Sequence, residues 1–305
     1  MKDIVIIGGG PAGLTSAIYA ARAGKSVKVY EKENLGGQIL FSPMVDNYPG
    51  IPHMNGATFV EKLTSQVEEL GVDIAYEEVT AIKRADGSDE YLVSGASGDQ
   101  RCKAIILATG VAHRTLGLPS EEELIGCGVS YCAVCDGAFY KGAPVAVVGG
   151  GDTALQDAIF LSATSSKVVL IHRRDEFRGE KRLVDRVLSN PKIEVIYCHT
   201  VDSFIEEDGI LTGLILKDTR TGETSQLDVE GVFLAVGQIP QSGPFKEMVD
   251  VDEQGYYYVG EDALTNEPGI FAAGDARIKG VRQLTTAVGD GAVAAVAACE
   301  YVDQL

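Results

Sequence analysis

The pattern of apolar and polar positions is clearest near the N-terminus. An apolar, β-branched run at 4–7 leads into the glycine-rich turn 8–13, and an Ala-rich segment then precedes a second apolar run that ends at Glu31. An apolar run bounded by glycines predicts a buried strand, and the Ala-rich segment predicts a helix. We therefore expect a strand, a tight turn, a helix and a strand, with Glu31 placed 21 residues after Gly10.

The same pattern returns in the middle of the chain. The apolar run 144–148 leads into the turn 149–154, and the next apolar run, 168–171, ends at His172, which again lies 21 residues after the third glycine. The two units differ in how the second strand ends, because His172 is followed by two arginines where the first unit has a carboxylate.

Both turns are typical of dinucleotide sites, in which glycines let the backbone approach a pyrophosphate at a helix N-terminus. The carboxylate of Glu31 is suited to accept hydrogen bonds from a free ribose 2′-hydroxyl, so the first site should hold FAD or NAD. Arg173 and Arg174 are suited to pair with a 2′-phosphate, which predicts NADP at the second site. Glycine turns also arise from packing alone, but the repeat at equal spacing favours two bound dinucleotides.

The rest of the chain completes two copies of one plan. The further elements that we expect are a helix at 57–70, strands at 72–84, 90–94, 104–108, 232–236 and 269–273, and a packed helix at 286–302. A length of 305 residues is compatible with two domains. We predict an α/β protein with two Rossmann-like nucleotide-binding domains of three ββα layers. The first domain is discontinuous, 1–112 and 242–305, and the second, 113–241, is inserted into it.

A pair of cysteines lies within the inserted segment, in the sequence Cys132-Ala-Val-Cys135-Asp136. A zinc site would need two further ligands, and the chain has no second CxxC motif. A pair of reduced structural cysteines is a second alternative. We favour a redox-active pair, because two intervening residues allow a disulfide to open and close without remodelling the fold. Asp136 is suited to donate a proton to a leaving thiolate, or to cap the next helix, and we favour the proton role.

The other cysteines and the charge of the chain limit the remaining function classes. We expect each of the isolated cysteines to be a small buried hydrophobic residue: Cys102, Cys127, Cys198 and Cys299. A net charge of −18 argues against nucleic acid and anionic membranes as partners. No segment approaches the roughly 18–20 consecutive apolar residues of a spanning helix. We therefore expect a cytoplasmic protein without a bound metal.

Several short motifs together cover essentially the whole chain. They are GGGPAG at 8–13, GGQ at 36–38, DNYPG at 46–50, ATG at 108–110, CAVCDG at 132–137, GGGDTA at 149–154, HRRDEFR at 172–178, AAGD at 272–275 and RQL at 282–284. With these motifs, the sequence closely resembles the low-molecular-weight, bacterial-type thioredoxin reductases. The resemblance implies a homodimer with FAD on the outer domain, NADPH on the inserted domain, and thioredoxin as the protein substrate.

The resemblance also implies roles for individual residues. Cys135 would form the charge-transfer contact with the flavin, Cys132 would attack thioredoxin, and Asp136 would serve as the acid. The expected FAD residues are Gly8, Gly10, Pro11, Ala12, Gly13, Glu31, Gly37, Gln38, Asn47, Val79, Thr109, Gly110, Gly274, Asp275, Arg282, Gln283 and Leu284. The expected NADPH residues are Gly151, Asp152, Thr153, His172, Arg173, Arg174, Arg178 and Gly237.

Two departures from the family pattern stand out, and other functions compete. Val134 stands where the family often has Thr, and Gln156-Asp157 replaces a frequent acidic pair.

Related candidates are the alkyl hydroperoxide reductase flavoprotein, which carries an extra N-terminal region, and a dithiol oxidase, which has no need of the arginines that follow His172. A non-enzymatic flavin redox sensor is the remaining alternative. Bleaching of the flavin by NADPH separates a reductase from an oxidase or a sensor.

Overall fold

The computed structural model describes residues 1–42, 45 and 47–305, so Asp46 of the DNYPG motif lies outside the described residues. The chain forms two compact units. Unit 1 contains Met1–Leu40, Val45–Ala112 and Ile239–Leu305, and unit 2 is built principally from His113–Gln238. None of the helices in the described part of the chain is long and apolar enough to cross a membrane.

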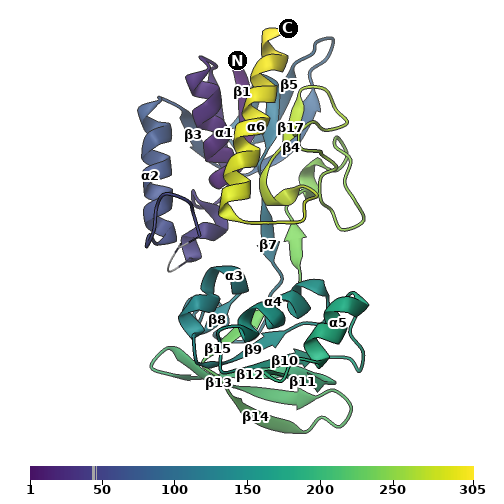
Figure 1. Cartoon of the computed structure of the whole chain (residues 1–305). Coiled ribbons are helices and arrows are strands. Elements are labelled where there is room, and N and C mark those ends of the chain that lie inside the picture. Colours follow the sequence, from purple (N-terminus) through teal and green to yellow (C-terminus); the bar gives the residue numbers. More distant parts are fainter. Residues whose placement is uncertain (43–44, 46) are drawn as a thin grey trace. The chain divides into compact units, whose positions relative to one another are not determined.

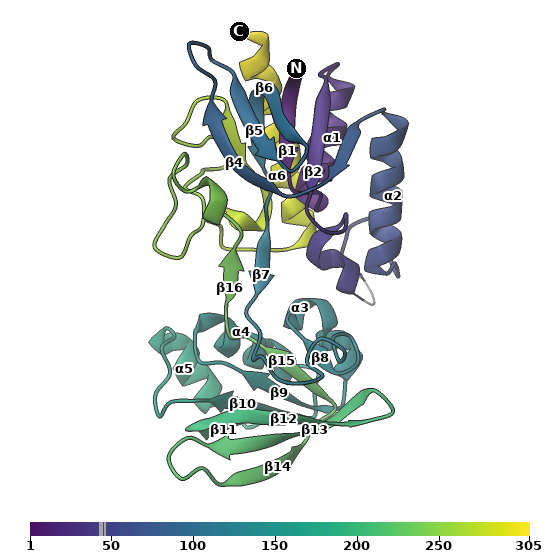
Figure 2. The ribbon, with the colours of Figure 1, turned by 180° about the vertical axis from the view of Figure 1, so that it is seen from behind.

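Unit 1 is a seven-stranded sheet covered by helices (Figure 1). Its parallel strands are β1 (Lys2–Ile7), β2 (Val27–Glu31), β3 (Asp73–Tyr76), β6 (Gly98–Leu107) and β17 (Ile270–Ala272). Strands β4 (Val79–Arg84) and β5 (Tyr91–Gly95) extend the sheet in antiparallel register beyond β6, and Figure 2 shows them from behind. Its helices are α1 (Pro11–Arg22), α2 (Gly56–Glu69) and α6 (Leu284–Asp303).

Small side chains bring the central helices of unit 1 close together. Helix α1 packs against α6, and a Cβ atom added at Gly291 would lie 2.2 Å from the carbonyl oxygen of Ala12. Ala294, Ala295 and Ala298 of α6 are fully buried in the same hydrophobic cluster. The Ala-rich pattern of the C-terminal segment therefore serves close helix packing, and it places Gly291 of α6 against Ala12 in the first turn of α1.

Unit 2 repeats the plan in three layers, with helices on one side of a parallel sheet and antiparallel strands on the other (Figure 1). The sheet contains β8 (Val129–Ser130), β9 (Pro144–Val148), β10 (Lys167–His172), β11 (Ile193–Tyr197) and β15 (Gly231–Leu234). The helices are α3 (Ala133–Asp136), α4 (Asp152–Ser162) and α5 (Lys181–Leu188), and the antiparallel strands are β12 (His199–Glu207), β13 (Ile210–Asp218) and β14 (Thr224–Asp228). The predicted α/β class with Rossmann-like sheets is confirmed.

The chain passes between the units at 112–113 and at 238–239. The strands at these crossings, β7 (Val111–His113) and β16 (Gln238–Pro240), pair with each other in a two-stranded sheet. Short 3₁₀ helices complete the structure: η1 (Gly37–Phe41), η2 (Gly137–Tyr140), η3 (Gly243–Phe245) and η4 (Gly274–Ala276).

Two sequence expectations differ from the structure. Strand β6 begins at Gly98, several residues before the expected start at 104, because its polar first half pairs with β5 as a hairpin and has no apolar run to reveal it. The prediction that Cys127 is buried was wrong, whereas Cys102, Cys198 and Cys299 are buried as expected. Cys127 lies in a turn in which its amide donates to the carbonyl of Leu124, so its side chain points outward ahead of β8.

Candidate active site

The first glycine turn joins β1 to α1 and leaves room for a phosphate group. Gly8 has a φ of +107°, and a Cβ atom there would lie 2.2 Å from the carbonyl oxygen of Ala108, so only glycine fits. At Gly10, by contrast, an added Cβ would meet no atom within 4 Å. The turn is thus fixed by packing on one side and open at the helix N-terminus, where backbone amides favour an anion.

Glu31 reaches this turn from the end of β2. Its Oε2 accepts a hydrogen bond of 2.7 Å from the amide of Gly9, and its Oε1 accepts one of 2.9 Å from the amide of Glu33. A carboxylate has about four acceptor positions, so two remain for a ligand. The geometry suits the predicted contact with a ribose hydroxyl.

The GGQ motif lies against the same turn. The amide of Gly36 donates to the carbonyl of Gly9 at 2.8 Å, and a Cβ at Gly37 would lie 3.7 Å from the Cα of Gly10. Gln38 follows in η1. Gly36 and Gly37, which are distant in sequence from Gly10, therefore lie beside the first glycine turn, as a site for an extended dinucleotide requires.

An acid with one buried oxygen follows Gly274, which lies against Ala12 of α1. Burial raises the pKa of Asp275, in η4, although Lys279 and Arg282 oppose this effect. Its Oδ1 is 3.3 Å from Lys279 Nζ, but it makes no hydrogen bond to the described residues. Apart from this ion pair, the Oδ1 oxygen has room to accept a hydrogen bond, and the hydroxyl groups of a flavin cofactor are donors of the right kind.

An ion cluster that sequence reasoning missed supports this acid. Asp290 Oδ2 accepts hydrogen bonds from the amide of Gly274 (3.1 Å), from Arg277 Nε (2.9 Å) and from Lys279 Nζ (2.9 Å), while Oδ1 accepts one from Arg277 Nη2 (2.8 Å). The one signal of this cluster in the sequence was Asp290 itself, a single acid within the otherwise uncharged, Ala-rich segment 284–299.

The RQL motif, at the start of α6, contacts both Asp275 and Asn47. Arg282 Nε donates to the carbonyl of Asp275 at 3.1 Å, and its guanidinium lies 4.2 Å from the centre of the Tyr256 ring. Gln283 Oε1 accepts from Asn47 Nδ2 at 3.0 Å, and Gln283 is also the N-cap of α6. The structure thus brings these predicted residues together, with Leu284 as the first residue of the helix.

The remaining predicted FAD residues take different positions. Pro11, Ala12 and Gly13 form the first turn of α1. Thr109 Oγ1 lies 3.3 Å from the hydroxyl of Tyr257, and Gly110 follows it. Val79, at the start of β4, belongs to a hydrophobic cluster that also contains Tyr30 and Ile7, the residue before Gly8.

The second glycine turn, in unit 2, joins β9 to α4 and has the same shape. A Cβ at Gly150 would lie 2.1 Å from the ring of His172, whereas a Cβ at Gly151 would meet nothing within 4 Å. Asp152 and Thr153 begin α4, and Asp152 Oδ1 accepts from the amide of Glu180 at 2.7 Å. The open helix N-terminus again offers backbone amides to a phosphate group.

Strand β10 ends at a buried histidine, and the loop after it carries three exposed arginines. His172 is 4% exposed, its Nε2 lies 2.9 Å from the carbonyl of Glu176, and burial lowers its pKa. Its ring is therefore used in packing. Arg173, Arg174 and Arg178 are exposed, and the amide of Arg178 donates to the carbonyl of Gly150 at 2.8 Å. This contact brings the arginine loop to the edge of the glycine turn.

Gly237, the last of the predicted NADPH residues, follows β15 at the second crossing between the units. It has a φ of +114°, and its carbonyl accepts a hydrogen bond of 3.0 Å from the amide of Arg114.

Cys132 and Cys135 form a disulfide, with their Cα atoms 5.3 Å apart. Cys132 is the N-cap of α3, and its Sγ accepts from the amide of Cys135 at 3.2 Å. The short helix α3 begins directly after Cys132 and ends with Asp136, so one turn of backbone and its N-cap hold all three predicted catalytic residues.

Asp136 is largely buried behind this disulfide, and burial raises its pKa, although a hydrogen bond from Ser130 opposes the shift. Oδ2 accepts that hydrogen bond at 2.6 Å, while Oδ1 is buried and makes no hydrogen bond to the described residues. The side chain makes no capping hydrogen bond to η2. The arrangement favours the proton role over the capping role.

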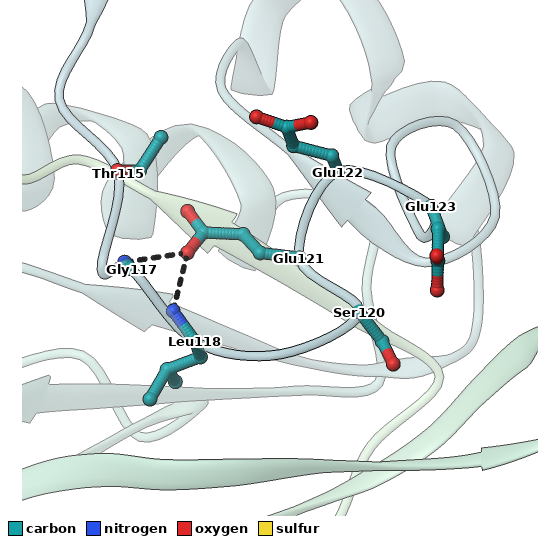
Figure 3. Close-up of a pocket in the computed structure, with 7 residues that line it drawn as sticks. All are labelled: Thr115, Gly117, Leu118, Ser120, Glu121, Glu122 and Glu123. Atoms are coloured by element: carbon teal, nitrogen blue, oxygen red, sulfur yellow. Dashed lines mark hydrogen bonds between the residues drawn. The ribbon is translucent and has the colours of Figure 1, made fainter.

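The residue before the dithiol is held by a second buried acid that the sequence did not reveal. Glu121 is 3% exposed, and its Oε2 accepts from the amides of Gly117 (2.9 Å) and Leu118 (3.3 Å) beside a cavity of about 250 Å³ (Figure 3). Its Oε1 accepts from the hydroxyl of Tyr131 at 2.7 Å. The Tyr131 ring stacks on His113 at 4.5 Å, and burial lowers the pKa of this histidine to about 4.

Comparisons with known proteins agree with this geometry. A family model described as pyridine nucleotide-disulphide oxidoreductase matches residues 2–291. The chain is 40% identical to the thioredoxin reductase of Bacillus subtilis, over 99% of this chain and 95% of that protein.

Solved structures are similar over the whole chain. The thioredoxin reductase of Streptococcus pyogenes is 39% identical with a TM-score of 0.95, covering 100% of this chain and 99% of that one. The thioredoxin reductase of Giardia duodenalis is 34% identical with a TM-score of 0.92, covering 99% of each chain. The resemblance inferred from the motifs is thus confirmed. The chain belongs to the pyridine nucleotide-disulphide oxidoreductase family.

Proposed function

We propose that this chain is a thioredoxin reductase, which passes electrons from NADPH through FAD and the Cys132–Cys135 pair to oxidised thioredoxin. The observation that carries the proposal is the disulfide with the partly unsatisfied, buried carboxyl group of Asp136 next to it. The relatives that carry this printed name are about 40% identical over 99% of the chain, which supports the same activity here.

We assign the cofactors by the chemistry of each unit. FAD would lie on residues 1–112 and 242–305, where Gly10 leaves space for its pyrophosphate and Glu31 and Asp275 offer carboxylate oxygens to its hydroxyls. NADPH would lie on residues 113–241, with Arg173 and Arg174 beside its 2′-phosphate. Between them, the bound cofactors supply a two-electron path from a nicotinamide to a disulfide.

The residues of the chain perform the thiol–disulfide exchange. In the reduced enzyme, the thiolate of Cys132 attacks one sulfur of the partner's disulfide and forms a mixed disulfide, and the other partner sulfur leaves with the electron pair and receives a proton from Asp136. The thiolate of Cys135 then attacks Sγ of Cys132. This step restores the intramolecular disulfide and releases the second partner sulfur as a thiolate, which takes a proton from solvent, so one two-electron exchange is complete.

The test compares NADPH with NADH as the reductant of oxidised thioredoxin and of a small disulfide. We expect a yellow protein whose flavin is bleached by NADPH, with efficient turnover only when thioredoxin is present. Cys132→Ser and Cys135→Ser should each abolish thioredoxin reduction while flavin bleaching persists. A colourless protein, or full turnover by Cys135→Ser, would refute the proposal. We also propose a homodimer, which light scattering on the purified protein would test.

A further inference from the structure

Ser130 connects the cysteine pair with the buried acid. It ends β8 and is 3% exposed. Its Oγ donates to Asp136 Oδ2 at 2.6 Å and accepts from the amide of Cys132 at 3.0 Å. Among the described residues, the one other acceptor of this hydroxyl is the carbonyl of Cys132 at 3.5 Å, so the single hydroxyl proton is committed to the carboxyl group. One side chain therefore ties the Asp136 carboxyl group to the backbone of the first cysteine.

This contact makes the two carboxyl oxygens of Asp136 different. Oδ2 has its donor in Ser130, whereas Oδ1 is buried and has no hydrogen bond to the described residues. A carboxylic acid carries its proton on one oxygen, and the oxygen that already accepts a hydroxyl is the poorer place for it. We propose that Ser130 is a positioning residue that keeps the proton of Asp136 on Oδ1, the oxygen that is free to deliver it to a leaving thiolate. The inference rests on the proposed function, in which Asp136 is the proton donor.

Ser130 keeps this role while Cys132 attacks the partner's disulfide. As the Cys132 sulfur bonds to one partner sulfur, the partner's S–S bond breaks and its other sulfur leaves with the electron pair. The proton on Oδ1 goes to that sulfur, and Asp136 becomes a carboxylate. The hydrogen bond from Ser130 then joins a hydroxyl to an anion, which strengthens it. Ser130 thus also stabilises the charge that Asp136 gains.

The surroundings of Asp136 give the direction of the pH effect. Burial raises its pKa, and the Ser130 hydrogen bond lowers it. The ionisable groups on the helices packed against α3 are Tyr140 in η2 and Asp152 and Asp157 in α4. Of these, Asp157 has its pKa raised to about 7 by burial, and Tyr140 has its pKa raised by burial and by the charge of Asp136. Loss of the Ser130 hydroxyl should therefore raise the pKa of Asp136 further.

The experiment measures exchange between the prereduced, FAD-loaded full chain and oxidised thioredoxin as a function of pH. Ser130→Ala should be about tenfold slower at its optimum, less than the ~10²-fold or more that loss of a general acid costs. The basic limb of its pH–rate profile should move to higher pH, because Asp136 then keeps its proton up to a higher pH. The infrared band of the protonated carboxyl group should shift as well. Reduction of the flavin by NADPH should not change.

The matched control is Ser165→Ala, which removes a fully buried hydroxyl of the same unit that makes no hydrogen bond to the described residues. This variant should leave the rate and the pH limb unchanged. Ser130→Thr and Ser130→Val form a second pair of variants for the same comparison, since Thr carries a hydroxyl group where Val carries a methyl group of similar size. We expect the Thr variant, and not the Val variant, to retain the wild-type limb.

The outcomes separate this inference from the proposed function. A uniform loss of rate in Ser130→Ala, with an unmoved limb and carboxyl band, would mean a purely structural role and would overturn the inference. A wild-type rate and limb would overturn it too. If Asp136→Asn is slow while Ser130→Ala is normal, the inference alone fails. If Asp136→Asn exchanges at the wild-type rate, the acid role in the proposed function fails as well.

Discussion

Replacement of Asp290 by Asn should destabilise unit 1 and weaken its hold on the flavin. The Asp290 carboxylate accepts hydrogen bonds from Arg277, Lys279 and the amide of Gly274. The side chains of Arg277 and Lys279 are only 7% and 5% exposed. Arg277 therefore loses its principal buried counter-charge, whereas Lys279 keeps an ion pair of 3.3 Å with Asp275. Glu261, the other acid near Arg277, is 93% exposed and compensates little.

The loss in the free energy of unfolding depends on the buried cations that remain when the Asp290 carboxylate is removed. Removal of one partner from a buried ion pair costs about 3–5 kcal/mol, because the remaining charge is buried without compensation. An exposed pair is worth about 0–1 kcal/mol. Asp73→Asn is the matched control in the same unit, since Asp73 pairs with Lys2 at 3.5 Å and its side chain is 49% exposed. The difference between the two variants should therefore be several kcal/mol.

Urea unfolding monitored by circular dichroism and by release of flavin fluorescence measures both effects. Burial raises the pKa of Asp290, but hydrogen bonds from Arg277 and Lys279 outweigh it, so the pKa lies below its ordinary value. The stabilisation is therefore present above the pKa of the unfolded carboxyl group, about 4, and is lost as the pH falls through the lower folded value. A loss no larger than that of Asp73→Asn, with unchanged flavin retention, would refute the reasoning.

Three further predictions test other parts of the site. Arg173→Ala combined with Arg174→Ala should raise KM for NADPH about 10²–10⁴-fold, because each of the two charge-assisted hydrogen bonds is worth about 1.5–3 kcal/mol. Bound FAD should stay, and an equal loss with NADH would contradict the 2′-phosphate role. Gly10→Ala should leave the fold of the apoprotein intact, because the added Cβ meets no protein atom within 4 Å, and it should lower FAD retention, because the Cβ enters the space left for the cofactor. Gly8→Ala should prevent folding, because its Cβ would collide with the carbonyl oxygen of Ala108. Circular dichroism measures the fold of each purified variant, and flavin absorbance measures FAD retention. Burial raises the pKa of Asp157 to about 7, so this acid binds a proton more tightly in the folded state and costs stability as the pH rises from about 4 through 7. Asp157→Asn should therefore raise Tm at about pH 8 and not at about pH 4, and equal Tm changes at both would refute the burial argument.

The sequence was informative where chemistry depends on neighbours along the chain. Strand, turn, helix and strand follow one another within about 30 residues in a dinucleotide-binding unit, so apolar runs and glycines sufficed to predict both turns. The cysteines and Asp136 lie within one helical turn, which explains why their proximity was predictable. Helix α2 (Gly56–Glu69) was expected at 57–70 from its apolar spacing, which is a local signal as well, and the structure adds Asn55 as its N-cap.

The residues that the sequence did not reveal all act across loops or between elements. Asp290 meets Gly274 across 16 positions, and Glu121 meets Tyr131 across 10, so neither contact leaves a periodic pattern. Each of these acids is buried, and a buried carboxylate persists only where donors from other segments converge on it. Convergence of that kind is a property of the packed chain. It also explains why Ser130, a residue with no motif of its own beyond its place before the dithiol, is the side chain that fixes the orientation of Asp136. The buried acids that most affect this site are therefore found by tracing donors around each carboxylate, and the motifs indicate only where to begin.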